Sequence, residues 1–167
     1  MTFNFSEFKN KKIIVTGSST GIGFETGVEF LNLGANVIFH GNQSINDLEA
    51  RIKTKSQSKN FKLFKSDFTD LSQVDNFMND AINYLDGLDI LVNNAGTMVG
   101  RYQLDSISEK DFLKIFDLNA KSAYFATKSA CTIFKKQNYG NIINVSTISA
   151  RTGGSAGSSV YAASKAF

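Results

Sequence analysis

A tyrosine and a lysine four positions apart, near the end of the chain, form the first pattern that could take part in catalysis. Tyr161 and Lys165 share one face if a helix begins near Ser158. A free phenol has a pKa of about 10, too high for efficient proton transfer at neutral pH, but a nearby ammonium group stabilises the phenolate. The pair could therefore exchange a proton with a bound substrate. An ordinary surface helix could carry the same spacing, so the pair depends on its context.

A glycine-rich turn near the start of the chain supplies that context. It follows the apolar run 13–15, which predicts a buried strand, and it precedes a helical pattern that Gly34 can end. Glycines at such a turn let the backbone approach a pyrophosphate, and the helix N-terminus offers N–H groups to it. A tight turn without a ligand is the alternative. The residues expected to bind the nucleotide here are Gly17, Ser19, Thr20, Gly21, Ile22 and Gly23.

The end of the second predicted strand bears on the choice of nucleotide. It reads Phe39-His40-Gly41-Asn42, where Asn42 is expected to bind the coenzyme, and it contains no carboxylate that would hold free ribose hydroxyls. A 2′-phosphate would not be repelled there, so NADP(H) is favoured over NAD(H), although this stretch offers no arginine to bind that phosphate. We interpret His40 as a strand-end residue near the adenosine. As the chain's single histidine, it predicts no metal site.

One asparagine interrupts an otherwise apolar helical stripe. Asn119 is the only polar member of a series spaced by three and four that comprises Phe112, Phe116, Ala123, Ala126, Ala130 and Ile133. A polar group on a buried face needs a partner. Asn119 is therefore either a core residue bonded to nearby backbone or a residue with a functional role.

Apolar runs and helical patterns alternate along the whole chain. Strands are expected at 13–15, 37–39, 61–65, 88–92 and 142–145, and a long helix from Ser108 to about Gln137. Asp70 with Gln73 resembles a capping box, and 151–159 reads as a loop. This alternation predicts a single α/β domain over 1–167, a Rossmann-type, doubly wound parallel sheet.

Composition excludes several other classes of protein. The chain is 42% hydrophobic and has a net charge of +3 from interspersed residues, which predicts a mixed surface and no nucleic-acid partner. No apolar stretch is long enough to cross a bilayer, so no membrane partner is expected. Cys131 is the only cysteine, and a protein without an internal disulfide is expected in the cytoplasm.

Taken in order, these motifs resemble the short-chain dehydrogenase/reductase family. The segment from Thr16 to Gly23 resembles its coenzyme motif, Asn93-Asn94-Ala95-Gly96 its fourth-strand motif, and Tyr161 with Lys165 its active-site motif. The nearest subgroup contains 3-oxoacyl-carrier-protein reductases and glucose dehydrogenases. The resemblance implies strand order 3-2-1-4-5 and an oxidoreductase that interconverts a carbonyl and an alcohol. It adds coenzyme-binding roles for Asp67, Phe68, Asn94, Ala95, Gly96, Tyr161 and Lys165.

The family also implies specific catalytic roles. Tyr161 would protonate the substrate oxygen, Lys165 would also hold the nicotinamide ribose, and Asn119 would hold a water molecule linked to that lysine. Thr147 falls where the family usually has a serine, and its hydroxyl can still donate to the substrate. Ser146 and Ser149 are the alternatives at this position.

The family's sheet continues for two strands beyond the Tyr–Lys helix, with a substrate lid that this sequence lacks. Full-length members usually form homo-oligomers through their fourth helix and the helix of the pair. A truncated, non-catalytic fragment that at most binds dinucleotide is therefore the alternative to an active enzyme, and a nucleotide sensor is a third reading.

Overall fold

The computed structural model describes residues 5–42, 45 and 47–167. Five parallel strands form one sheet in the order β3-β2-β1-β4-β5, which confirms the predicted Rossmann-type architecture. Their bounds are β1 Lys12–Val15, β2 Asn36–Gly41, β3 Phe61–Lys65, β4 Ile90–Asn93 and β5 Asn141–Asn144.

The centre of the sheet is apolar on both faces. On one face, Ile13 of β1 lies in register with Val37 of β2 and Ile90 of β4. On the other face, Ile14 lies in register with Ile38 and Leu91, and all six side chains are buried. Continuous apolar strands of this kind need helices on both sides to exclude water. The short runs that predicted strands therefore also explain why the sheet is covered twice.

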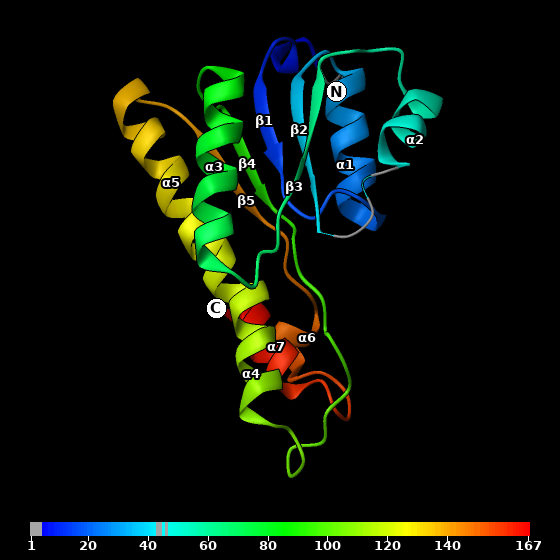
Figure 1. Cartoon of the computed structure of the whole chain (residues 1–167), viewed down its shortest axis with the longest axis vertical. Coiled ribbons are helices and arrows are strands. Elements are labelled where there is room, and N and C mark those ends of the chain that lie inside the picture. The colour runs from blue at the N-terminus through cyan, green and yellow to red at the C-terminus, as the bar shows by residue number, and fades with distance from the viewer. Residues whose placement is uncertain (1–4, 43–44, 46) are drawn as a thin grey trace.

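Two pairs of helices cover the faces (Figure 1). On one side, α1 (Gly21–Asn32) and α2 (Leu48–Lys55) pack on a core that contains Phe24, Leu31 and Ile52. On the other side, α3 (Leu71–Leu85) and α5 (Ser122–Gln137) pack on a core that contains Met78 and Ala126. A short 3-10 helix, η1 (Phe5–Phe8), precedes β1.

A smaller group of helices lies beyond the carboxyl ends of the strands, at the bottom of Figure 1. It contains α4 (Glu109–Phe116), α6 (Ser149–Thr152) and α7 (Ser159–Ala166). Helix α7 packs against α4 and α6 and carries the tyrosine–lysine pair. This arrangement places the end of the chain next to the edge of the sheet where the strands end.

The single long helix expected from Ser108 to Gln137 is wrong in its middle. Ser108 caps α4 as expected, with its hydroxyl accepting from the Asp111 N–H at 3.1 Å. One wide π-turn, η2 (Asp117–Lys121), then separates α4 from α5. A pattern spaced by three and four does not reveal one extra residue in a turn, and π-turns often occur at functional sites. Asn119 lies inside this one.

Two local predictions are also corrected. Asp70 caps α3 by accepting from the Ser72 N–H at 2.9 Å, but Gln73 does not complete a reciprocal box. Its side-chain oxygen accepts instead from the Asp67 N–H at 2.8 Å, which ties the preceding loop to the helix. The expected loop 151–159 begins inside the short helix α6, which extends to Thr152.

Among the described residues, no helix combines the length and the apolar character that crossing a bilayer requires.

Candidate active site

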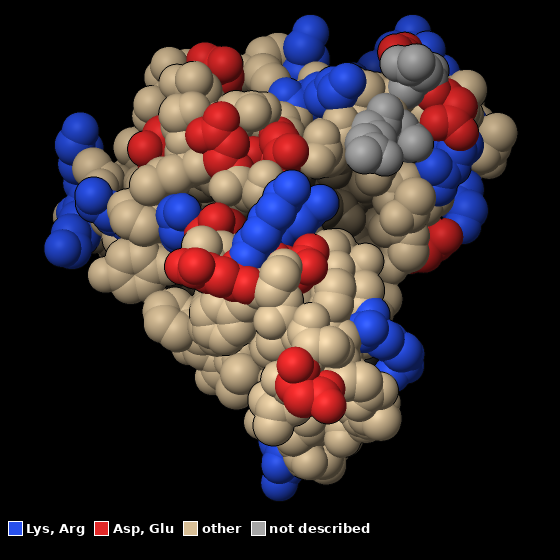
Figure 2. Space-filling view, turned by 60° about the horizontal axis from the view of Figure 1, so that its bottom comes forward, with Lys and Arg blue, Asp and Glu red and all other residues tan. Residues whose placement is uncertain are grey.

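A cavity of about 780 Å³ opens at the carboxyl ends of the strands. Its walls come from the β1–α1 turn, the end of β2, the β3–α3 loop, the segments after β4 and β5, and α7. Figure 2 shows acidic and basic side chains interspersed over the face that carries this hollow. Chain order reverses between β1 and β4, and open α/β sheets bind ligands at this kind of crevice.

The glycine turn after β1 brings backbone close to the cavity. Gly17 has φ +61°, and a Cβ on it would lie 2.6 Å from the Cα of Ala95, so only glycine fits. Gly21 has φ +58° and opens α1. Thr20, the N-cap residue, makes no capping hydrogen bond with its side chain. The first N–H groups of α1 therefore have no side-chain cap and are available to an anion.

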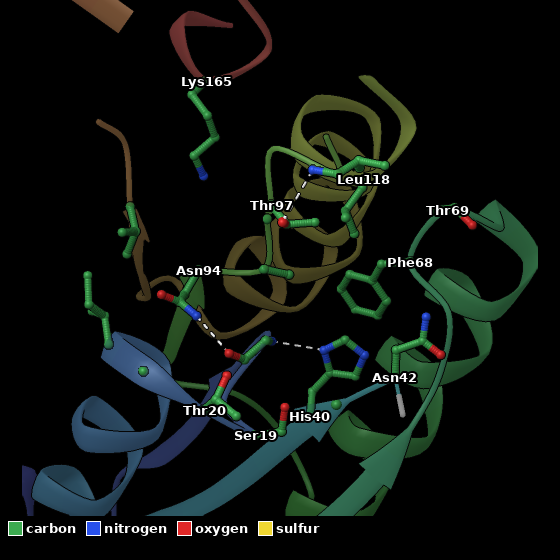
Figure 3. Close-up of a pocket in the computed structure, with 18 of the residues that line it drawn as sticks. Ser19, Thr20, His40, Asn42, Phe68, Thr69, Asn94, Thr97, Leu118 and Lys165 are labelled. Atoms are coloured by element: carbon green, nitrogen blue, oxygen red, sulfur yellow. Dashed lines mark hydrogen bonds between the residues drawn. The ribbon is translucent and has the colours of Figure 1, made fainter. Parts of the chain in front are cut away.

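Hydrogen bonds between distant segments fix the shape of this turn. The Thr16 hydroxyl accepts from the N–H groups of Asn94 and Ala95, each at 3.0 Å. The Asn94 amide donates to the carbonyls of Thr16 and Gly17, each at 2.9 Å. Figure 3 shows the Asn94 side chain pointing toward the glycine turn. Residues almost eighty positions apart thus form one rigid edge.

Two of the predicted nucleotide residues on α1, Ile22 and Gly23, differ in their position relative to the cavity. Gly23 does not line the cavity; it lies directly beneath Asn94, where a Cβ would be 2.3 Å from the amide nitrogen. Ile22, which was expected to bind the nucleotide, lines the cavity and is 69% exposed although its side chain is apolar. An apolar side chain at that place suits a ligand surface rather than the core.

The opposite wall contains His40, Asn42, Asp67 and Phe68. The His40 ring stacks on Phe68, with centroids 4.0 Å apart, as Figure 3 shows. Burial lowers the pKa of His40 to about 4, so the imidazole is neutral at physiological pH. Burial also acts to raise the pKa of Asp67. Hydrogen bonds from Thr69 and Asn42 outweigh it, and the pKa lies below its usual value.

Arg51 is a residue near the site that sequence analysis missed. Its guanidinium donates to the Ser19 carbonyl at 2.9 Å and lies 4.5 Å from the Phe24 ring centroid. Arg51 does not line the cavity itself, but it contacts Ser19, which does, so an arginine lies beside the site although the stretch 39–42 contains none. Arg51 is ten positions beyond the end of β2, and only the return of α2 against the glycine turn brings it there. A basic residue on the first turns of a polar helix was the available signal.

The tyrosine–lysine pair lines the same cavity as the glycine turn. Tyr161 and Lys165 are both partly buried on α7, and Figure 3 shows Lys165 extending into the cavity from that helix. Burial lowers the pKa of Lys165. Thr147 also lines the cavity, whereas Ser149 does not. Ser146 donates its hydroxyl to the Lys165 carbonyl at 2.7 Å and thereby anchors the end of α7.

Asn119 is 4% exposed and has backbone partners. Its side-chain oxygen accepts from the Thr97 N–H, and its amide donates to the Thr97 carbonyl, both at 2.9 Å. The side chains of Asn119 and Lys165 both lie close to Gly96. A Cβ on that glycine would be 2.6 Å from the Asn119 oxygen and 3.3 Å from the lysine nitrogen. Asn119 lines a second cavity of about 220 Å³ that also includes Lys165, rather than the large one.

These observations define a class of protein, because the large cavity fits a dinucleotide in several independent ways. Its volume lies within the range of ligand pockets, and its glycine turn allows close backbone approach. Its charged lining residues are Asp67, Lys114 and Lys165, a balance that favours an anion. Among the described residues, no three histidine, cysteine or acidic side chains cluster to hold a metal ion. The fold is that of nucleotide-binding α/β proteins, and its cavity also contains a tyrosine and a lysine one helical turn apart.

Comparison with known families makes the assignment specific. The model described as short chain dehydrogenase matches residues 11–167, nearly the whole chain. The chain belongs to the short-chain dehydrogenase/reductase family.

Curated relatives include several named reductases and dehydrogenases. A probable NADP-dependent mannitol dehydrogenase of Yarrowia lipolytica is 32% identical over 142 residues, which cover 84% of this chain and 51% of the relative. Sorbose reductase of Schizosaccharomyces pombe is 30% identical, with 89% of this chain and 59% of the relative covered. The chain therefore spans little more than half the length of these relatives.

Solved structures agree with this fold. An NADH-dependent reductase crystallised with NAD superposes with a TM-score of 0.88 at 32% identity, covering 98% of this chain and 70% of its own. A short-chain alcohol dehydrogenase from Sinorhizobium meliloti, itself of inferred function, superposes with a TM-score of 0.85 at 28% identity.

Proposed function

We propose that the protein is an NAD(P)(H)-dependent oxidoreductase that interconverts a carbonyl and an alcohol. The observation that carries the proposal is the shared cavity: Tyr161 and Lys165 of α7 line the same space as the glycine turn after β1. A nucleotide anchored at that turn would lie within the cavity that the phenol and the ammonium group enter. Both parts of the chemistry would then act on one bound molecule.

In this proposal each residue has a defined task. A nicotinamide coenzyme, when bound, supplies or accepts the hydride. Tyr161 gives a proton to the substrate oxygen or removes one from it. The Lys165 ammonium group favours the phenolate and binds the coenzyme ribose. Thr147, whose hydroxyl accepts from the Ser149 N–H at 3.3 Å, keeps its own proton to donate to the substrate oxygen.

Asn119 has a supporting task beside the lysine. Its amide holds the Thr97 backbone, and its oxygen keeps one lone pair beyond the bond from the Thr97 N–H. We assign to it a water molecule in the cavity of about 220 Å³ that it shares with Lys165. Such a water would link the ammonium group to solvent while the phenol changes its protonation state.

NADP(H) is the coenzyme that we favour over NAD(H). β2 ends in Gly41, which offers no carboxylate to repel a 2′-phosphate, and a Cβ on that glycine would lie 2.8 Å from Ser19. Arg51 uses one N–H on the Ser19 carbonyl and keeps other donors for an anion. Among relatives, the Yarrowia lipolytica protein is named NADP-dependent, whereas the structural neighbour is named NADH-dependent.

Titration with NADPH and NADH, followed by nicotinamide fluorescence, tests coenzyme binding. We expect NADPH to bind more tightly, and Arg51→Ala to weaken NADPH at least tenfold while leaving NADH nearly unchanged. Lys53→Ala is the matched control, because Lys53 lies on the same helix but pairs with Glu49 at 2.6 Å. Failure of both coenzymes to bind at millimolar concentration would refute the proposal.

A panel of ketones and ketoesters with NADPH tests the chemistry. We expect the intact chain to oxidise NADPH and Tyr161→Phe to lose nearly all turnover while still binding NADPH. Sugar-derived ketones deserve a place in the panel because two relatives carry sugar-alcohol and sugar names. Ketoacyl substrates would test the resemblance to 3-oxoacyl-carrier-protein reductases.

A fragment that binds dinucleotide without turnover is the second candidate. The chain covers 51–59% of the curated relatives named above, and Ile143 on the outermost strand β5 is 44% exposed. NADPH binding without oxidation of any ketone, in both the intact chain and Tyr161→Phe, would favour this candidate. Size-exclusion chromatography with light scattering would test the homo-oligomer expected from the family.

A further inference from the structure

His40 connects two loops that both line the large cavity. Its Nδ1 accepts a hydrogen bond from the Gly17 N–H at 2.9 Å, and its Nε2 lies 3.1 Å from the Ser66 carbonyl oxygen. A backbone N–H can only donate and a carbonyl can only accept. The two bonds therefore require the neutral ring that carries its proton on Nε2.

The main chain of His40 strengthens the same connection. Its carbonyl accepts from the Ser18 N–H at 2.7 Å, and its N–H donates to the Ser18 hydroxyl at 2.8 Å. His40 is 3% exposed, and its ring packs against Phe68 and Phe77, with centroids 4.0 and 4.8 Å away. One residue thus joins the glycine turn to the β3–α3 loop by hydrogen bonds on both sides.

We propose that His40 is a positioning residue that holds the Gly17 turn and the Ser66–Phe68 loop at the spacing required by the adenosine half of the coenzyme. This inference rests on the proposed function, because it concerns the geometry of the same coenzyme site. No other side chain places an acceptor and a donor on opposite edges of one flat ring. Asparagine could serve Gly17 alone, and glutamine could reach Ser66 alone.

The electrostatic surroundings keep His40 in the required form at the pH of the cell. Desolvation lowers its pKa to about 4, against opposing contributions from the Ser66 carbonyl and the Asp67 carboxylate. Lys114 also lines the cavity, and its positive charge lowers the pKa of Asp67. Phe68 and Phe77 bring no charge to the ring. The contribution of His40 to coenzyme affinity should therefore not change between pH 6 and 8.

Nuclear magnetic resonance gives a direct readout because the chain contains a single histidine. A long-range ¹H–¹⁵N spectrum of the intact protein at pH 7 should show an unprotonated Nδ1 and a protonated Nε2. Addition of NADP⁺ should preserve that tautomer and shift both nitrogen signals. A ring protonated on Nδ1, or signals that NADP⁺ leaves unchanged, would overturn the inference.

Three substitutions separate the two hydrogen bonds. His40→Asn keeps an acceptor near Gly17, His40→Gln keeps a donor near Ser66, and His40→Phe keeps only the ring stack. From the usual contribution of one hydrogen bond, the dissociation constant for NADP⁺ should rise roughly threefold in His40→Asn and roughly tenfold in His40→Gln. In His40→Phe we expect a larger rise. The Michaelis constant for the coenzyme should rise likewise, with kcat nearly unchanged.

A buried control distinguishes positioning from general stability. Ile52→Val removes a methylene group from the core beneath α2, away from the cavity, and should lower stability without changing the NADP⁺ dissociation constant. If the folded His40 variants bind NADP⁺ as tightly as the unaltered protein, the inference fails and the proposed function stands. If the unaltered protein binds no NADP(H), both fail together.

Discussion

Gly23→Ala is the substitution for which the structure gives the clearest magnitude. A Cβ on Gly23 would lie 2.3 Å from the Asn94 amide nitrogen and 2.6 Å from the Gly17 carbonyl oxygen. The methyl group fits only if Asn94 withdraws or α1 moves. Withdrawal breaks the two bonds from the Asn94 amide to the carbonyls of Thr16 and Gly17.

The individual effects combine to a net loss. Two amide–carbonyl hydrogen bonds contribute about 2 kcal/mol. Overpacking against the Gly17 backbone costs about 2 kcal/mol more. Alanine recovers about 1 kcal/mol, because glycine is the poorer helix former. The free energy of unfolding should therefore fall by about 3 kcal/mol, and coenzyme binding should weaken as the turn shifts.

Urea denaturation followed by far-ultraviolet circular dichroism measures this loss. Gly21→Ala is the matched control, because a Cβ there meets no atom within 4 Å and only the φ of +58° costs energy, about 1 kcal/mol. Adding Asn94→Ala to Gly23→Ala should cost less than the two single losses combined, since the first change removes the clashing amide. A Gly23→Ala protein within 0.5 kcal/mol of the original, a value at the limit of such measurements, would refute the reasoning.

Three further outcomes follow from contacts in the same region. The pKa of His40 is about 4 in the folded chain, against an ordinary value of 6.5, so the unfolded chain binds the proton more readily. The free energy of unfolding should therefore fall by about 3 kcal/mol in total as the pH falls from 6.5 to 4. Urea titrations across that range measure this loss, and His40→Asn should make the free energy of unfolding depend less on pH. Thr16→Val removes the acceptor of two backbone N–H groups and should lower the free energy of unfolding by about 2 kcal/mol in the same assay. Gly96→Ala would displace the Asn119 oxygen, which lies 2.6 Å from the new Cβ, and should lower kcat roughly a hundredfold with a smaller effect on NADPH binding. Stopped-flow turnover measures kcat, and fluorescence titration measures NADPH binding. An unchanged kcat would contradict the role given to Asn119.

The sequence was sufficient for the architecture because the information was local. Short apolar runs predict buried strands, and a helical pattern follows most of them. Strands that are joined by helices run parallel in one sheet, so the alternation of strands and helices was predictable. The Rossmann order needed the family resemblance in addition. The cavity lining by Gly17, Tyr161 and Lys165 followed from the same ordered motifs.

The remaining features depend on where the chain returns in space. Arg51 reaches the Ser19 carbonyl only because α2 packs back against the turn, and Gln73 chooses the Asp67 N–H over its own helix cap for a similar reason. The π-turn around Asn119 adds one residue to a turn, which a hydrophobic stripe cannot resolve. The sequence showed His40 only as a residue at the end of a strand. Its donor partner Gly17 and its acceptor partner Ser66 lie twenty-three and twenty-six residues away, so neither contact was predictable.

The position of β1 at the centre of the sheet has a consequence for biosynthesis. This strand is made before both of its neighbours, β2 and β4, and the Lys12 N–H finds its Asp89 partner only 77 residues later. On the ribosome, one whole edge of β1 must therefore wait unpaired while α1, α2 and α3 are translated. A nascent chain in that state is a natural client for chaperones, and refolding in dilute solution should be slow for a protein of this size.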